Sequence, residues 1–248
     1  MSIAPRYLPP NTTFIEDDDL PVTMQIGMIG KDGIVLASDK KWSTTWVKRD
    51  RAKIQELRDE HSDSKILLSP TGNLAVCCAD DMIAANDVAQ KVISGWSPET
   101  DDSQGSALNA LVKPLCSHRP FQCIVASTHP EPSLFYISND LRFEDRPLSI
   151  TRALDRICAG DRANAAKFWH LRYYEPNLPT PKLFSLAAQL ITDAAVLNPA
   201  IIGGFDLAVS KRGVFRRIPK QKCDSLAEVA QQRSKAVSEL IFGTATRN

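Results

Sequence analysis

The chain has 248 residues, enough for one large domain with a sizeable hydrophobic core. With 43% hydrophobic and 24% charged residues and a net charge of +1, it has no general electrostatic attraction to nucleic acids, membranes or acidic substrates. No apolar run approaches the length of a bilayer span, and residues 1–22 lack the apolar core of a secretory signal. We therefore expect a cytoplasmic protein that binds neither nucleic acid nor membranes.

The cysteines and histidines do not predict a metal site. The six cysteines form no CxxC motif, and the four histidines do not cluster at metal-ligand spacings. Cys77 and Cys78 are neighbours in an apolar run, so at least one of them is expected to face a core. Buried, reduced thiols are the simplest interpretation, and we expect no metal and no other cofactor.

The first part of the chain predicts an extension followed by hairpins. Residues 1–22 are rich in proline and then acidic, which predicts an N-terminal extension or propeptide ahead of one domain over 23–248. The domain opens with a predicted hairpin whose turn is Lys-Asp-Gly at 31–33. A polar, mostly basic segment follows over 40–64, and 65–79 is predicted to form a second hairpin.

The rest of the chain alternates between helical and strand patterns. The last predicted helix opens with a capping box formed by Ser225 and Glu228. The last predicted strand pair turns at Gly213. Antiparallel hairpins interleaved with helices are typical of sheets stacked between helical layers, an α+β fold. The predicted helices cover 82–93, 107–115, 162–174, 182–196 and 226–241, and the predicted strands cover 121–127, 133–138 and 204–218.

Several motifs together resemble one family. TMQIGMIGKDGIVLASDKK (23–41) is similar to the start of a mature proteasome-type β subunit, with a Thr, a Gly four residues on, a Lys-Asp-Gly turn and an Ala-x-Asp after the second strand. CAGDRANAA (158–166) resembles the entry to the family's third helix, and IIGGFDLAVSKRGV (201–214) resembles its Gly-Gly signature. The spacing from SD (38–39) to GNLA (72–75) resembles the bacterial proteasome-related branch called Anbu.

This resemblance covers about residues 23–218 and implies a fold and an assembly. The implied fold is a four-layer αββα sandwich of the N-terminal nucleophile (Ntn) hydrolase type. The implied partners are other copies of the same chain, in a ring or stacked rings that enclose a chamber, together with polypeptide substrates. Whether an ATPase feeds the chamber stays open at this point.

The resemblance also implies a threonine-type endopeptidase, with Thr23 as the nucleophile and Asp39 as the carboxylate. A threonine hydroxyl is a poor nucleophile without a base beside it. In a chain that begins at Thr23, the α-amine, whose unperturbed pKa is about 7.7–8.0, would be that base. A lysine ammonium nearby would lower this pKa further, and Asp39 would keep the lysine charged and oriented. The activity therefore requires cleavage between Val22 and Thr23.

Two lysines compete for the third position. Lys53 lies about where the family's lysine precedes an apolar residue, and the Anbu-like spacing to GNLA favours it. Lys65 has the better strand after it, but this assignment needs a ten-residue insertion. We therefore predict Lys53 and keep Lys65 as the alternative. Backbone N–H groups near Gly72 or Gly160 are the predicted donors to the oxyanion.

The sequence departs from the family's pattern beside the predicted site. Val22 stands where the family has Gly, and a β-branched residue resists the tight turn that self-cleavage needs. The Ser expected near 159–161 is absent, and the Asp and Ser expected ahead of the Gly-Gly pair are replaced by Asn198 or Pro199 and by Ile202. A second hypothesis therefore stays open, a non-catalytic structural subunit of a proteasome-like ring with an unprocessed N-terminus.

A third hypothesis concerns the basic segments 40–53 and 210–222. Their Lys and Arg residues, together with Trp42 and Trp46, could contact phosphates and stack on bases. The balanced total charge favours solvated loops or subunit contacts for both segments.

Overall fold

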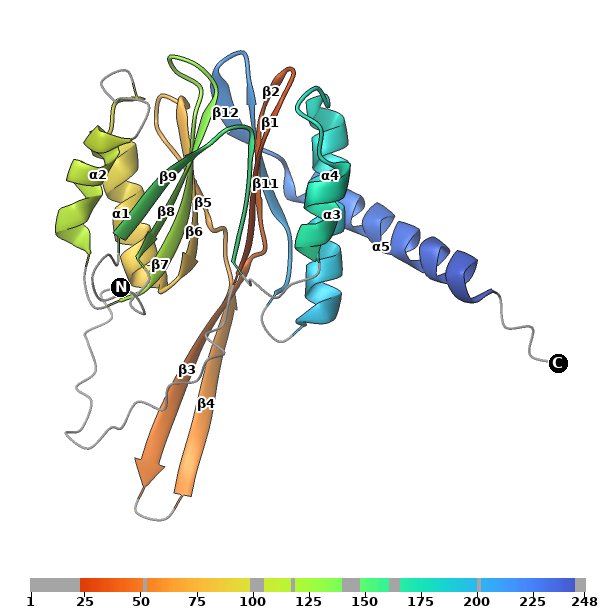
Figure 1. Cartoon of the computed structure of the whole chain (residues 1–248). Coiled ribbons are helices and arrows are strands. Elements are labelled where there is room, and N and C mark those ends of the chain that lie inside the picture. Colours follow the sequence, from red (N-terminus) through yellow and green to blue (C-terminus); the bar gives the residue numbers. More distant parts are fainter. Residues whose placement is uncertain are drawn as a thin grey trace.

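A computed structural model describes residues 23–50, 53–98, 105–116, 119–139, 148–160, 166–199 and 202–243 (Figure 1). The predicted extension over 1–22 lies outside these residues. The described residues form two antiparallel five-stranded sheets, a separate two-stranded hairpin and five α-helices. The predicted α+β class is confirmed.

The first sheet brings together strands from the start, the middle and the end of the described chain. Its order is β10–β1–β2–β11–β12, and every neighbouring pair is antiparallel. The predicted turns at 31–33 and at Gly213 join β1 to β2 and β11 to β12. The strands are β1 (Met24–Gly30), β2 (Gly33–Ser38), β10 (Arg156–Gly160), β11 (Asp206–Lys211) and β12 (Val214–Arg217).

The second sheet runs in sequence order, β5–β6–β7–β8–β9, and is antiparallel throughout. Strands β6 and β7 are almost continuously apolar because both of their faces are covered, one by helices and the other by the first sheet. The strands are β5 (Ile66–Leu68), β6 (Leu74–Asp80), β7 (Phe121–Ser127), β8 (Ser133–Asn139) and β9 (Leu148–Ala153).

Helices cover the outer faces of both sheets (Figure 1). Helices α1 (Met82–Gly95) and α2 (Ser106–Val112) lie on the second sheet, and a short 3-10 helix over Lys113–Leu115 continues α2. Helices α3 (Ala166–Tyr173) and α4 (Thr180–Leu197) lie on the first sheet. None of the helices in the described part of the chain combines the length and the apolar character that a membrane crossing requires.

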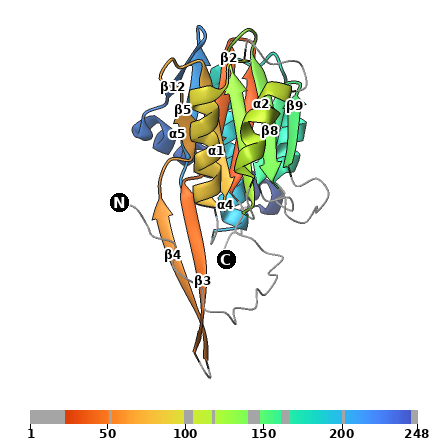
Figure 2. The same cartoon turned by 90° about the vertical axis from the view of Figure 1, so that its left-hand side faces the viewer.

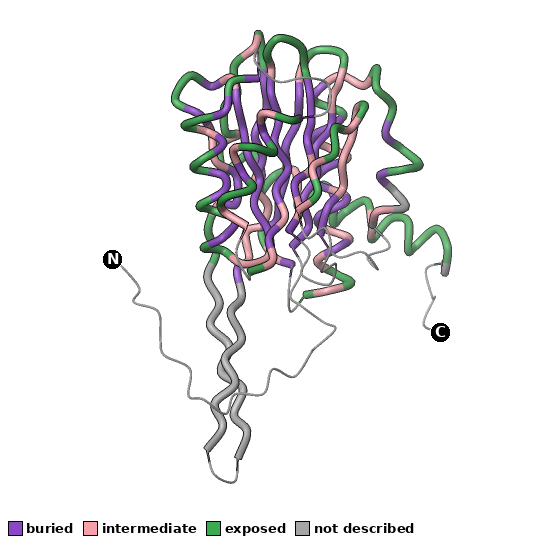
Figure 3. The backbone as a smooth tube through the Cα atoms, turned by 60° about the vertical axis from the view of Figure 1, so that its left-hand side comes forward, coloured by how far each residue is buried: buried purple, intermediate pink, exposed green. Residues whose placement is uncertain are grey.

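The core lies in three apolar layers. One layer is between α1, α2 and the second sheet, one is between the two sheets, and one is between the first sheet and α4. Figure 3 shows the buried residues concentrated in the strands and on the sheet-facing sides of the helices. A polar side chain between the sheets is cut off from water, so a hydrogen bond inside the protein is needed to offset the cost of its burial.

Helix α5 (Lys220–Phe242) begins earlier than the sequence predicts. The chain enters the helix directly after Pro219, whose carbonyl oxygen accepts hydrogen bonds from the N–H groups of Lys222 and Cys223. Cys223 is buried in the core beside α4, and this burial draws the first turn into the helix. The predicted start at a Ser225 capping box is wrong, since Ser225 lies inside the helix.

The segment predicted to be merely polar contains a long hairpin. Strands β3 (Lys41–Asp50) and β4 (Lys53–Ser62) pair from Lys41↔Ser62 at the base to Asp50↔Lys53 at the tip. Figures 1 and 2 show the hairpin leaving the body of the domain as an arm. Apolar alternation does not mark this arm in the sequence.

Candidate active site

The β1–β2 hairpin brings Thr23 and Asp39 together. Thr23 immediately precedes β1 and Asp39 immediately follows β2, and the register pairs Gln25 with Ser38. Backbone contacts then join the two ends, because Asp39 N donates to Met24 O at 3.2 Å and Met24 N donates to Asp39 Oδ1 at 3.0 Å. The hairpin register alone therefore places the predicted carboxylate beside the predicted nucleophile.

Lys65 completes this group from the other sheet. It lies just before β5, and its Nζ is 2.7 Å from Thr23 Oγ1 and 3.2 and 3.0 Å from the two carboxylate oxygens of Asp39. The three residues are 5%, 0% and 1% exposed for Thr23, Asp39 and Lys65. A hydroxyl, an amine and a carboxylate thus meet in a nearly water-free place between the two sheets.

Lys53, the lysine predicted for this site, does not lie near Thr23 and Asp39 in the structure. Lys53 begins β4 at the tip of the arm, whereas Ser62 at the other end of β4 lies at its base. A ten-residue strand rises about 3.3 Å per residue, so roughly 30 Å of strand separates tip and base. The insertion that counted against Lys65 is the arm itself, which leaves the domain after Asp39 and returns just before Lys65.

The Asp39 carboxylate is fully hydrogen-bonded although it is buried. It accepts hydrogen bonds from Lys65 and from the backbone N–H groups of Met24 and Lys41, the last at 3.0 Å. Burial raises the pKa of Asp39, and the Lys65 charge and these hydrogen bonds oppose the rise. Burial likewise lowers the pKa of Lys65 against the opposing charge of Asp39. Lys65 therefore releases its proton more readily than a lysine in water.

Trp42 covers the lysine at the base of the arm. Its ring centroid lies 4.8 Å from Lys65 Nζ, within the range of a cation–π contact. The Trp42 side chain is 8% exposed and belongs to the core beneath α1, so it is not available to stack on a base. From the sequence, Trp42 was predicted to lie in a solvated basic segment. The contact with Lys65 was missed because the whole β3–β4 arm separates the two residues in the chain.

Gly160, one of the two predicted oxyanion donors, lies against the backbone of Thr23. It pairs with Met24 at the end of β10 and has a φ of +103°, and a Cβ on it would lie 1.5 Å from the carbonyl oxygen of Thr23. Its N–H donates to Gln122 Oε1 at 3.3 Å. Gly72 lies elsewhere, in the β5–β6 turn against Val214, where its N–H donates to Ser69 O.

Two of the residues that depart from the family's pattern around the Gly-Gly pair have defined places in the fold. Ile202 is 1% exposed and packs in the core beneath α4. Asn198 ends α4, and its N–H donates to Ala194 O.

Within the described ranges, no three His, Cys, Asp or Glu side chains gather closely enough to share a metal ion.

Comparison with known proteins identifies the fold. No protein-family model and no curated protein sequence matches the chain. Among solved structures, Anbu from Hyphomicrobium sp. strain MC1 superposes with a TM-score of 0.62 at 15% identity, and Anbu (ancestral beta-subunit) from Yersinia bercovieri with a TM-score of 0.63 at 12% identity. A helical assembly of the Anbu complex from Pseudomonas aeruginosa gives a TM-score of 0.63 at 14% identity.

Each of these three matches covers 91% of this chain and 100% of the other. At such low identities the comparison speaks for the fold alone. That fold is the one of the Anbu structures.

Proposed function

We propose that the domain over 23–248 is an αββα subunit of a proteasome-like assembly and acts as a threonine-type endopeptidase once Thr23 is N-terminal. One observation carries this proposal. The buried Lys65 amine lies 2.7 Å from Thr23 Oγ1 and is held by Asp39, so the hydroxyl has a charged or basic partner aimed directly at it. The proposed site residues are Thr23, Asp39 and Lys65.

In a chain that begins at Thr23, the free α-amine accepts the hydroxyl proton as Oγ attacks the carbonyl carbon of a peptide bond. The C–N bond then breaks, the leaving amine takes the proton, and an ester remains on Thr23. Water hydrolyses the ester, releases the carboxylate product and restores the hydroxyl. The Lys65 ammonium stabilises the negative charge that develops on Oγ, and it does so strongly because the site is buried.

Removal of residues 1–22 needs a different base. Before this cleavage the nitrogen of Thr23 belongs to the peptide bond with Val22 and cannot accept the hydroxyl proton. Lys65 in its neutral form lies within hydrogen-bonding distance of Oγ1, and burial favours that form by lowering the pKa. Neutral Nζ takes the hydroxyl proton while Oγ attacks the carbonyl carbon of Val22. The Val22–Thr23 C–N bond breaks, Nζ returns the proton to the Thr23 nitrogen, and water hydrolyses the resulting ester. The β-branched Val22 slows the attack.

A second candidate function is that of a non-catalytic subunit in which residues 1–22 stay attached. The observation in its favour is that Asp39 has a structural task of its own. Its carboxylate accepts the backbone N–H groups of Met24 and Lys41, and the pair with Lys65 joins the two sheets. This pair would therefore persist in a subunit that performs no chemistry.

We also propose that copies of the chain assemble with one another in a ring or a helix. The similar fold of the Pseudomonas aeruginosa Anbu complex, whose structure is a helical assembly, supports this proposal. Polypeptides that enter such an assembly would be the substrates.

The decisive experiment compares four forms of the full chain, namely the unchanged protein, Thr23→Ala, Lys65→Met and the matched control Lys53→Met. Intact mass shows whether a species beginning at Thr23 forms, and unfolded-protein hydrolysis measures the activity. We expect processing and hydrolysis in the unchanged protein and in Lys53→Met. We expect neither in Thr23→Ala, and a loss of about a hundredfold or more in Lys65→Met.

Two results would contradict the peptidase. If the unchanged protein keeps residues 1–22 and hydrolyses nothing, the non-catalytic subunit is correct. If Thr23→Ala retains the hydrolysis, the nucleophile lies elsewhere.

A further inference from the structure

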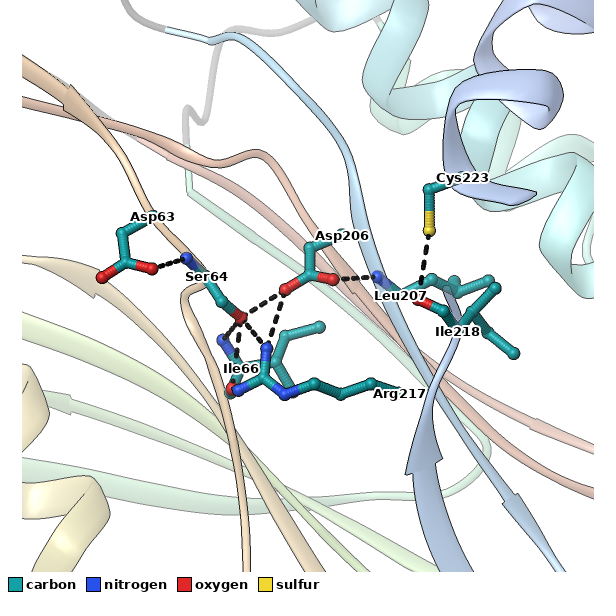
Figure 4. A network of polar contacts seen from close by, with 8 residues as sticks. All are labelled: Asp63, Ser64, Ile66, Asp206, Leu207, Arg217, Ile218 and Cys223. Carbon is teal, nitrogen blue, oxygen red and sulfur yellow. Dashed lines mark hydrogen bonds and ion pairs between the residues drawn. The ribbon is translucent and has the colours of Figure 1, made fainter. Parts of the chain in front are cut away.

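Ser64 and Ile66, the two neighbours of Lys65 in the chain, are both hydrogen-bonded to residues of the first sheet (Figure 4). Ser64 precedes Lys65, and the Ser64 hydroxyl forms close hydrogen bonds with both Asp206 and Arg217. Ile66 follows Lys65, and the Ile66 carbonyl oxygen accepts a close hydrogen bond from Arg217 Nη2. Arg217 Nη1 and Asp206 Oδ2 are themselves 3.1 Å apart. One ion pair therefore holds the chain immediately before and immediately after the lysine.

This ion pair belongs to a different sheet from the lysine that it flanks. Asp206 is the first residue of β11 and Arg217 is the last residue of β12, and both strands lie in the first sheet. Lys65 leads into β5, which has three residues and lies at the edge of the second sheet with β6 as its neighbour. So short an edge strand has few ladder hydrogen bonds to fix its start, and the ion pair supplies further ones.

Asp206 is also anchored beside the other half of the site. In the sheet register it pairs with Ser38, the residue directly before Asp39. Its carboxylate is mostly buried, with a side chain 13% exposed, and its second oxygen accepts the N–H of Leu207 at 3.0 Å. Asp206 thus lies next to the end of β2, where Asp39 follows, and is hydrogen-bonded to Ser64, directly before Lys65.

We propose that Asp206 and Arg217 are positioning residues that set where Lys65 enters the space between the sheets and so maintain the contact between its amine and the Thr23 hydroxyl. They act through Ser64 and Ile66. The positional claim rests on the contacts above, and its consequence for catalysis rests on the proposed function.

Hydrogen exchange of the full chain tests the positional claim. The N–H of Cys78 donates to Lys65 O at 2.8 Å, so its exchange reports release of this segment. In Arg217→Met we expect the Cys78 amide to exchange roughly tenfold faster, which corresponds to about 1.4 kcal/mol in the free energy of local opening. Ser64→Ala removes only the bridging hydroxyl and should also accelerate exchange of the Cys78 amide, by a smaller factor. This variant replaces Arg217→Met in the test if Arg217→Met does not fold.

The matched control is Tyr174→Phe, which removes a hydroxyl that donates to Ile29 O and Asp155 O at the other end of β1. It controls for a general loss of stability, and Cys78 exchange should stay unchanged in it. Unchanged exchange in both Arg217→Met and Ser64→Ala, or equal acceleration in Tyr174→Phe, overturns the proposal.

The pH dependence of the removal of residues 1–22 tests the catalytic consequence. Release of the segment lets water reach Lys65, so its pKa rises toward the ordinary value and the pH of half-maximal rate moves upward in Arg217→Met. Arg217→Lys keeps the charge but not the planar fork, so its shift should be intermediate. A slower rate with an unmoved pH midpoint is the signature of a merely structural role and overturns positioning. A protein that never reacts at Thr23 overturns the proposed function alone, because the exchange measurement still decides the positional claim.

Discussion

Lys65 combines nearly complete burial with a titratable amine, and this combination governs the behaviour of the site. A buried ion pair gains stability from mutual attraction but loses the hydration of both partners. Here burial is the largest influence on the pKa of each partner, raising that of Asp39 and lowering that of Lys65. The pair therefore contributes least to stability when both of its groups are charged.

This balance predicts how stability depends on pH. The pKa of Asp39 in the folded protein lies above its ordinary value of 3.8. The contribution of Asp39 to the free energy of unfolding is therefore present below pH 3.8 and is lost as the pH rises from 3.8 through the raised pKa. Because the folded pKa of Lys65 lies below its ordinary 10.5, its contribution is gained as pH rises from the lowered pKa toward 10.5. Each unit of pKa shift changes the free energy of unfolding by about 1.4 kcal/mol.

The measurement is the free energy of unfolding of the unchanged protein minus that of the double variant Asp39→Asn/Lys65→Met, over a series of pH values. We expect this difference to be smallest between the two pKa values. A maximum in the same range would show that attraction within the pair outweighs burial.

Gly160 is the second residue on which the site depends. A methyl group there would overlap the backbone carbonyl of Thr23, which cannot swing away as a side chain could, and the φ of +103° adds strain. We expect Gly160→Ala to destabilise the fold by at least about 3 kcal/mol, as measured by denaturant unfolding. Gly203→Ala is the control, because its added Cβ makes only ordinary contacts with Lys41, and it should change stability by about 0.5 kcal/mol or less. Equal effects of the two variants would contradict the close packing at Gly160.

At the scale of elements, the first hairpin also fixes the start of a helix. Asp32, in the β1–β2 turn, accepts hydrogen bonds from Thr180 N at 2.7 Å and from Thr180 Oγ1 at 3.2 Å, where α4 begins. Helix α4 begins after Pro179, whose side chain offers no cap, so a carboxylate from a distant turn takes this place. The turn therefore orients the helix that covers β1.

Removal of this cap predicts a measurable loss of stability. Asp32→Ala should lower the free energy of unfolding by about 1 kcal/mol, the usual effect of losing a capping side chain. In a domain of this size the melting temperature should fall by roughly 2–4 °C. Asp32→Asn, which keeps one acceptor oxygen, should lose less. A loss as large as that of Asp32→Ala would mean that the charge, and not the hydrogen bond, matters.

At the scale of the whole molecule, α5 leaves an apolar surface uncovered. Helix α5 extends away from the body (Figure 1), and the side chains of Val237, Leu240 and Ile241 near its end are 50%, 85% and 67% exposed. Their spacing of three and four residues puts them on one side of the helix. In the proposed assembly, a second copy of the chain would cover this surface.

Light scattering of the full chain tests this prediction. We expect a mass well above the 27.4 kDa of one chain for the unchanged protein. Leu240→Glu combined with Ile241→Glu should shift the mass toward that of one chain without loss of helicity in circular dichroism. Gln231→Glu with Gln232→Glu adds the same charge to exposed positions of the same helix and should leave the mass unchanged. A monomeric unchanged protein would contradict the proposed assembly.

Local patterns predicted the elements that cover or build a core. The apolar runs of β6, β7 and β8 and the helical faces of α1 and α4 lie close to their predicted ranges, because burial on a defined face imposes a period on the sequence. Strands β9 and β10 and the arm of β3 and β4 were not predicted. Strand β9 has no buried residue and so carries little apolar signal, and β10 is held by pairing with β1, which lies far from it in the chain.

The sequence indicated Thr23 and Asp39 through the resemblance to proteasome-type β subunits, and the two residues meet because they lie at the ends of one hairpin whose register depends on a local turn and on alternating apolar residues. It could not select Lys65 over Lys53. That selection depends on an arm inserted between the carboxylate and the lysine and on a contact between two sheets. Hairpin register is a local property that short-range spacing records, whereas contact between sheets depends on how the whole core packs.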